Sequence, residues 1–163
     1  MSRVGAAVVV ALLLVACSSG PPTVTELTVR AAWARTTPEN ATNGVAYLTI
    51  TSPTDDRLVG VAVPGDIAAA AELHETMGGA GASPMPNMPD MTTPGSEMTM
   101  TPLDSVELPA GTAVVFEPGG KHIMLTGLTG PLLAGAHLPL TLTFASGTTL
   151  TVDVVVAVSA PES

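Results

Sequence analysis

The sequence predicts an all-β domain folded as an antiparallel sandwich or barrel, and three observations support this class. Apolar residues alternate with polar ones at a period of two, most regularly at Leu138, Leu140, Leu142 and Phe144. The alternating segments are short and are separated by Gly, Pro, Asn and Asp, which favour turns. No stretch beyond the N-terminal region has a convincing helical period of 3.6 residues. Many short strands joined by such turns are typical of sandwiches and barrels.

Eight segments carry the strand pattern. In each, aliphatic residues recur on one face, as Ala46, Leu48 and Ile50 do in the second segment. Aromatic residues make up only 2% of the chain, so the core is expected to consist of Val, Leu, Ala and Ile. With 163 residues the chain is long enough for one domain. The predicted strands are 25–33, 44–51, 57–63, 71–77, 112–117, 121–127, 138–145 and 149–158.

The N-terminal region resembles a bacterial lipoprotein signal. Residues 4–15 form an apolar run that is too short to span a bilayer as a mature helix. The run leads into Leu-Val-Ala-Cys, which is similar to a lipobox, where cleavage makes Cys17 the first residue and its thiol takes a lipid. We therefore expect a signal peptide over residues 1–17, a tether over 18–24, and an extracytoplasmic protein anchored to the cell membrane. An ordinary cleaved signal with an incidental cysteine is the alternative.

Composition excludes several function classes. Cys17 is the only cysteine, so a lipidated chain has no internal disulfide and no cysteine nucleophile. The formal net charge of −9 argues against nucleic acid as a partner, because binding nucleic acid requires basic patches. No paired-carboxylate, Ser-His-Asp or phosphate-loop signature stands out, so the sequence does not predict an enzyme.

Residues 78–97 break the strand pattern. This segment is rich in Gly, Ala, Pro and Met and has no apolar periodicity, so we expect a loop. Because the segment has no regular apolar face, its thioethers cannot all be core filler. Five of the eight methionines lie in it or just after it: Met85, Met88, Met91, Met98 and Met100.

A histidine and a methionine lie two residues apart in the segment Gly-Gly-Lys-His-Ile-Met-Leu, residues 119–125. Side chains at i and i+2 of a strand point to the same side, so His122 and Met124 are expected to share a face. Ile123 and Leu125 then occupy the opposite face. The pattern places a nitrogen ligand beside a soft sulfur ligand.

The potential ligands of the chain are His74, His122, His137 and the methionines. Thioether sulfur together with imidazole suits Cu(I), whereas zinc usually takes Cys, His or carboxylate, and calcium takes oxygen. A blue-copper electron-transfer site requires a cysteine ligand, and none remains after lipidation. The ligand types therefore predict a protein that holds copper.

The segment around His122 and Met124, residues 118–125, resembles the core motif of the periplasmic copper chaperone family PCu(A)C. The resemblance covers about residues 27–158 and implies a cupredoxin-like, antiparallel Greek-key barrel or sandwich. It also implies Cu(I) binding by two His and two Met, and a role in supplying copper to the CuA centre of cytochrome c oxidase. Five other segments are similar in the same order: 32–35, 43–47, 55–58, 72–76 and 140–144.

The resemblance assigns four ligands: His74, Met100, His122 and Met124. In the family, ten residues separate the first His from the first Met, and twenty-one separate that Met from the His-X-Met pair. The interval between Met100 and His122 matches, but twenty-five residues separate His74 from Met100. An insertion in the Met-rich loop explains the difference. Met85, which lies at the family spacing from His74, is the competing candidate, and Met98 is a further one.

Other polar and aromatic residues are expected to have structural or surface roles. His137 precedes a strand and is expected to be a surface turn residue, while Met77 is expected to pack or to lie in the loop. Trp33, Arg35 and Tyr47 are expected to be structural, although a basic residue near the site could help a partner to dock.

Taken together, the sequence predicts an extracytoplasmic Cu(I) chaperone domain over residues 25–158, followed by a tail over 159–163. Its expected partners are copper, an apo-cytochrome c oxidase subunit or another copper chaperone, and the membrane through the lipid anchor. Two other hypotheses remain open. The Met-rich segment would suit a lipoprotein that scavenges or buffers copper, and the domain could be a cell-envelope binding module without a metal.

Overall fold

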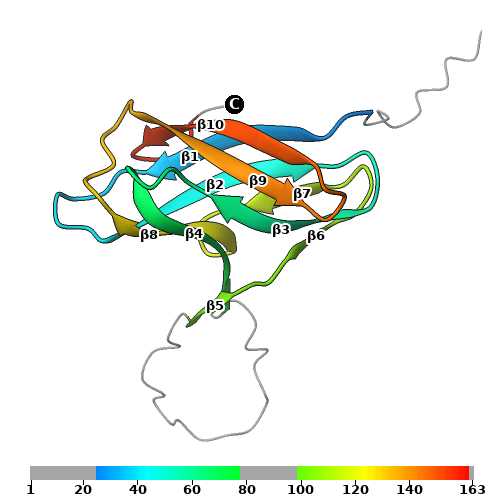
Figure 1. The fold of residues 1–163 in the computed structure, drawn as a ribbon, viewed down its shortest axis with the longest axis horizontal. Coiled ribbons are helices and arrows are strands. Elements are labelled where there is room, and N and C mark those ends of the chain that lie inside the picture. Colours follow the sequence, from blue (N-terminus) through cyan, green and yellow to red (C-terminus); the bar gives the residue numbers. More distant parts are fainter. Residues whose placement is uncertain (1–24, 78–98, 162–163) are drawn as a thin grey trace, which may run out of the picture.

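The computed structural model describes residues 25–77 and 99–161, which form an all-β domain (Figure 1). The expected signal peptide, Cys17 and the tether lie outside these residues, as do Met85, Met98 and the segment 78–97. In the described part of the chain, no helix has the length and apolar character needed to cross a membrane. The strands are β1 (Thr28–Arg35), β2 (Asn43–Thr51), β3 (Asp56–Ala62), β4 (Ala68–Met77), β5 (Thr99–Pro102), β6 (Val106–Leu108), β7 (Ala113–Phe116), β8 (Lys121–Leu128), β9 (His137–Phe144) and β10 (Thr149–Ala157).

The strands form one strongly curled sheet in the order β5-β4-β8-β2-β1-β10-β9-β3-β6, and β7 pairs with β2. β2 changes partner along its length, pairing with β8 at Asn43–Ala46 and with β7 at Leu48–Thr51. Residues of β3 and β4 line one hollow where the curled sheet approaches itself. The result is a half-barrel, consistent with the predicted all-β, cupredoxin-like class.

All eight predicted strands are present, with ends that differ by three residues or fewer from the expected ones. Two strands, β5 and β6, were not predicted, because their four and three residues are too short to display a period. β4 begins earlier than predicted, since the run Ala68–Ala71 has low strand propensity by itself but pairs with β8.

One strand pair departs from the antiparallel expectation. β1 and β10 run parallel, with Trp33 opposite Val155 and Ala34 opposite Val156. Apolar alternation specifies which face a residue occupies but not the direction of the neighbouring strand. The sheet is therefore mixed, and this pair joins the N-terminal and C-terminal strands of the domain.

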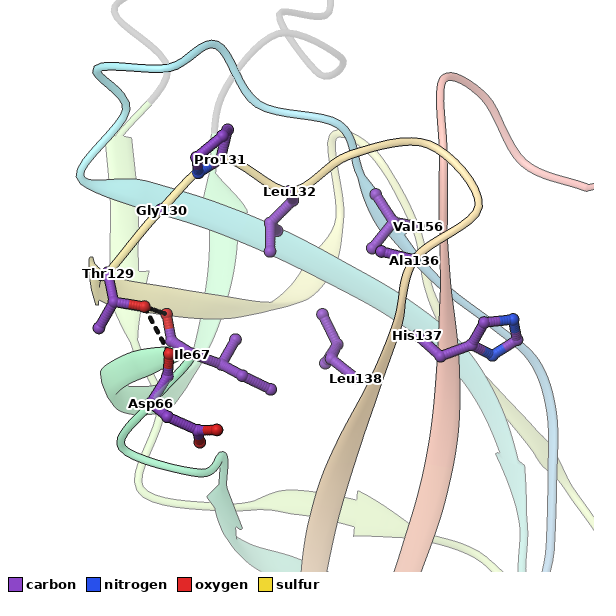
Figure 2. A pocket seen from close by; sticks show the side chains of 10 residues that line it. All are labelled: Asp66, Ile67, Thr129, Gly130, Pro131, Leu132, Ala136, His137, Leu138 and Val156. Carbon is purple, nitrogen blue, oxygen red and sulfur yellow. Dashed lines mark hydrogen bonds between the residues drawn. The ribbon is translucent and has the colours of Figure 1, made fainter.

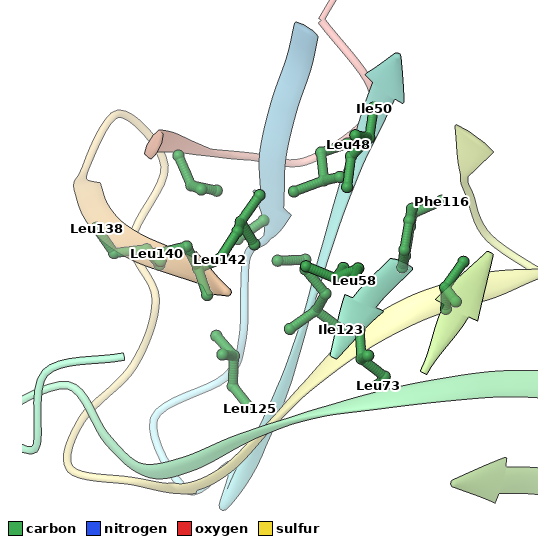
Figure 3. Close-up of a cluster of buried hydrophobic side chains, with 14 of the residues drawn as sticks. Leu48, Ile50, Leu58, Leu73, Phe116, Ile123, Leu125, Leu138, Leu140 and Leu142 are labelled. Atoms are coloured by element: carbon green, nitrogen blue, oxygen red, sulfur yellow. The ribbon is translucent and has the colours of Figure 1, made fainter. Parts of the chain in front are cut away.

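The core fills the concave side of the curled sheet with aliphatic side chains and two phenylalanines (Figure 3). Leu48 and Ile50 of β2 and Leu138, Leu140 and Leu142 of β9 are at most 2% exposed, as the alternation predicted. Burying such side chains contributes roughly 1.5–3 kcal/mol each to folding. Because the core occupies one side, the other face of β4, β8 and β2 is free for other chemistry.

A β-bulge interrupts β1. The register against β2 shifts between Arg30 and Trp33, and Ala31 adopts a left-handed φ of 49°. Such bulges leave extra residues unpaired and redirect the strand. Beyond the bulge, Trp33 pairs with Tyr47, and their ring centroids lie 4.8 Å apart with the ring planes tilted by 38°.

Candidate metal centre

Two histidines meet across neighbouring strands on the face opposite the core. His74 of β4 is directly opposite His122 of β8, with ring centroids 5.9 Å apart and ring planes 18° from parallel. Directly opposed residues of an antiparallel pair project to the same side of the sheet. The register between β4 and β8 therefore brings together imidazoles that are far apart in the sequence.

The backbone fixes the ring of His122. Its Nδ1 lies 3.1 Å from the carbonyl oxygen of Gly120, which also accepts the N–H of Thr76 at 3.1 Å. A carbonyl oxygen only accepts, so Nδ1 carries the proton and donates it. In a neutral imidazole the lone pair is then on Nε2, the arrangement that orients a histidine toward a metal.

One nitrogen of each ring lacks a hydrogen-bond partner among the described residues. Nδ1 of His74 and Nε2 of His122 are both buried without a hydrogen bond to any described residue. His122 as a whole is only 3% exposed. A buried polar atom without a partner costs roughly 1–3 kcal/mol, and an unplaced ion is one of the few explanations for it. Two such atoms on facing rings indicate a site for a bound Lewis acid.

Met124 follows on the same face. It lies two residues beyond His122 on β8 and is opposite both Val45 of β2 and Glu72 of β4. Ile123 and Leu125, which alternate with it, are fully buried in the core. The alternation predicted from the sequence is therefore present, with a histidine and a methionine on one side of β8.

Met100 approaches the same region from β5. It pairs with Thr76 of β4, is 52% exposed, and shares with Met124 the wall of a shallow, mainly apolar hollow of about 220 Å³. The sequence argument preferred Met100 to Met85 on spacing, and the structure places Met100 beside the proposed site. The remaining residues of the hollow are Arg35, Thr36, Thr37, Asn43, Gly44 and Val45.

An ion pair joins β4 and β8 next to the histidines. Nζ of Lys121 lies 2.8 Å from Oε1 of Glu75, one residue along from the His74–His122 pair. Both side chains are about one third exposed, so the pair contributes little to stability, on the order of 1 kcal/mol or less. It is one of the directly opposed residue pairs of β4 and β8 and lies next to the facing imidazoles.

Several rim residues were not predicted as part of the site. Asn43 and Val45 lie on the face of β2 opposite Ala46, and Glu72 lies opposite Met124. The alternation of β2 could have indicated the first two, but the neighbouring strand was unknown. Arg35 and Tyr47 also interact on this side. Burial raises the pKa of the Tyr47 phenol, while the positive charge of Arg35 lowers it.

His137 lies outside the candidate metal centre. It begins β9, is exposed, and its Nδ1 is 2.7 Å from Oδ2 of Asp153. It borders a separate hollow of about 180 Å³, and its ring points away from Leu138 (Figure 2). None of the other candidate ligands lines this hollow, so His137 does not join them.

The side chains on the face that carries His74 and His122 include soft metal ligands. In the two described ranges, no three or more His, Cys, Asp and Glu side chains cluster in a way that could hold a metal. Zinc and calcium sites are usually built from such groups. The face instead offers two imidazoles, with two thioethers on its exposed side. This set fits Cu(I), which favours thioether and imidazole donors.

Sequence comparisons give a consistent picture. The family described as "LpqE-like: Putative lipoprotein LpqE-like" matches residues 27–156. The "Putative lipoprotein Lxx21020" of Leifsonia xyli subsp. xyli is 34% identical over 94 residues, or 58% of this chain. The match spans about half the length of that relative, 48%.

Solved structures with a similar fold include PCuAC domains. The copper-bound PCuAC domain of PmoF2 has a TM-score of 0.59 and 22% identity, covering 83% of this chain and 96% of that domain. The solution structure of Cu(I)-DR1885 from Deinococcus radiodurans has a TM-score of 0.53 and 26% identity, covering 86% and 84%. The predicted resemblance to PCu(A)C domains is thus confirmed in the fold.

Proposed function

The chain belongs to the LpqE-like lipoprotein family, and we propose that it is a copper-binding protein of the chaperone type. The copper-bound states of the PmoF2 domain and of DR1885 support this proposal. The observation that carries it is the facing pair His74–His122, each ring with a buried nitrogen that has no partner among the described residues.

The proposed ligands are His74, His122, Met124 and Met100. His122 supplies nitrogen from the buried side of the site and Met100 supplies sulfur from the exposed side, while His74 and Met124 are half-buried. All four donors are neutral, so a bound Cu(I) keeps its single positive charge. Neutral thioethers exchange readily, which allows the site to hold copper and then release it to another soft ligand. This function requires no bond-breaking chemistry, so we do not propose an enzyme.

The finer parts of the proposal concern location and recipient. Lipidation at Cys17 would anchor the domain outside the cytoplasm, and the copper would pass to the CuA centre of cytochrome c oxidase or to another chaperone. Thioether ligands suit an oxidising compartment, because methionine does not form cross-links as cysteine does. A copper buffer in which the segment 78–97 adds capacity is the competing function.

Anaerobic titration of the form lacking residues 1–17 with Cu(I), against a competing chelator, tests the proposal. We expect one tightly held copper per chain, and X-ray absorption should report sulfur and nitrogen neighbours in similar numbers. The double variant His122→Ala, Met124→Ala should lose this copper. Unchanged affinity in the double variant would contradict the proposed site.

Copper transfer distinguishes a chaperone from a buffer. A chaperone should deliver its copper to an apo-CuA fragment faster than free chelated copper does, and deletion of 78–97 should leave this transfer intact. Several coppers per chain that disappear with the deletion, and no transfer, would favour buffering instead.

A further inference from the structure

The proposed site has a buried side and an open side. His122 is 3% exposed, whereas Met100 is 52% exposed and forms the solvent side of the hollow that it shares with Met124. An incoming ligand can therefore reach a bound copper ion at the exposed thioether of Met100, through this hollow.

The wall of the hollow is itself apolar and partly exposed. Its lining is mainly apolar, and Met100 is one of the exposed large apolar side chains of the described ranges. An exposed apolar surface beside a binding site indicates a contact surface.

One positive charge borders the hollow. Arg35 is exposed, and within the described residues it forms no ion pair, whereas Lys121 pairs with Glu75 and Arg57 with Glu107. Arg35 lines the hollow together with Met100 and Met124. With a formal net charge of −9, the chain is otherwise strongly acidic.

We propose that this hollow is a docking surface for an acidic copper-binding protein, which places a carboxylate on Arg35. The inference rests on the proposed function. The partner's apolar side chains cover the apolar wall of the hollow, and its soft donor forms a bond to copper as the bond to the Met100 sulfur breaks. The copper keeps its charge during this exchange, so neither an oxidant nor a reductant is needed.

Charge explains why such a partner docks here and not on another face. Like-charge juxtaposition disfavours wrong orientations, and a complementary charge on the rim mainly increases the association rate. An acidic partner is repelled by most of this chain. Arg35 is the point at which attraction, apolar contact and access to the sulfur ligands coincide.

A pair of synthetic peptides tests the proposal. One contains methionines flanked by aspartates, and its counterpart has asparagine in place of each aspartate. Both are titrated into the copper-free and Cu(I)-loaded protein while the methionine methyl groups are followed by NMR. We expect the acidic peptide to perturb Met100 and to bind more tightly than its counterpart at low ionic strength, with the difference reduced at high salt.

Charge reversal at Arg35 is compared with a matched control. Arg35→Glu should weaken the acidic peptide by about fivefold and leave the neutral peptide unaffected, as expected for one exposed ion pair. Arg30→Glu, on the same strand and also exposed, should change neither affinity. If Arg35→Glu disturbs the fold by circular dichroism, Arg35→Gln replaces it, with a smaller expected loss.

Three results would overturn the inference. The two peptides could bind alike, Arg30→Glu could weaken the acidic peptide as much as Arg35→Glu, or sedimentation could show that a second copy of this chain occupies the surface. Failure of the proposed function is distinguishable, because it is measured separately as loss of Cu(I) affinity. Peptide docking to the copper-free protein does not depend on that affinity.

Discussion

The two faces of β8 differ in the kind of side chain that they bury. On one face, Ile123 and Leu125 are fully buried and surrounded by apolar side chains. On the other, His122 is nearly as buried, but one of its nitrogens has no partner in the described structure. Both faces belong to the same eight-residue strand. The comparison shows that a strand can obtain its stability from one face while the other carries an unsatisfied group, which we propose binds a metal.

The largest effect is expected on the core face. Ile123→Ala removes a fully buried side chain and leaves a cavity, so it should lower the free energy of unfolding by about 2–5 kcal/mol. Urea denaturation of the copper-free protein measures this. Cu(I) stoichiometry below the unfolding transition should not change, and a loss of copper binding from the folded variant would contradict the division between the faces.

The next prediction concerns the opposite face. His122→Phe keeps the ring but removes both nitrogens, so Cu(I) affinity should fall by more than the roughly 10–100-fold seen when a supporting residue is lost. The unfolding free energy of the copper-free protein should stay within about 1 kcal/mol, because the lost bond to Gly120 is offset by removal of an unpaired buried nitrogen. A strongly destabilised variant would show that His122 has a mainly structural role.

A smaller effect is expected at the exposed thioether. Met100→Leu retains an apolar side chain but removes the sulfur, and it should weaken Cu(I) binding by about tenfold without changing the melting temperature. Met124→Leu is the matched variant on β8 and should cost more, because Met124 is less exposed and lies on the same strand as His122. Chelator competition ranks the two. A larger loss for Met100→Leu would place the weaker sulfur ligand on β8, and equal losses would contradict a ranking by exposure.

The smallest effect is expected at the bulge of β1. Ala31 holds a φ of 49°, a region that disfavours residues with a Cβ atom and that glycine adopts readily. Ala31→Gly should therefore raise the free energy of unfolding, by about 0.5–1 kcal/mol, and leave Cu(I) affinity unchanged. Thermal unfolding monitored by circular dichroism would detect it. Destabilisation would show that the flexibility of glycine in the unfolded chain outweighs the relief of strain.

Much of the fold follows from local patterns. Alternation identified the eight longer strands and the core residues of β9, since a side-chain period of two is a property of the strand itself. The same rule placed His122 and Met124 on one face. The short strands β5 and β6 and the alanine-rich start of β4 escaped detection, because pairing with neighbours, and not local preference, makes them strands.

By itself, the sequence determined the all-β class, the opposite faces of β8 and the soft character of the candidate ligands. Only the tertiary structure decided that β1 and β10 run parallel, that His74 lies opposite His122, and that Met100 shares a hollow with Met124. The physical reason is the distance along the chain between the residues that determine each property. The face on which a side chain lies depends on its neighbours along the strand, whereas cross-strand partners depend on register between segments that are distant in the chain.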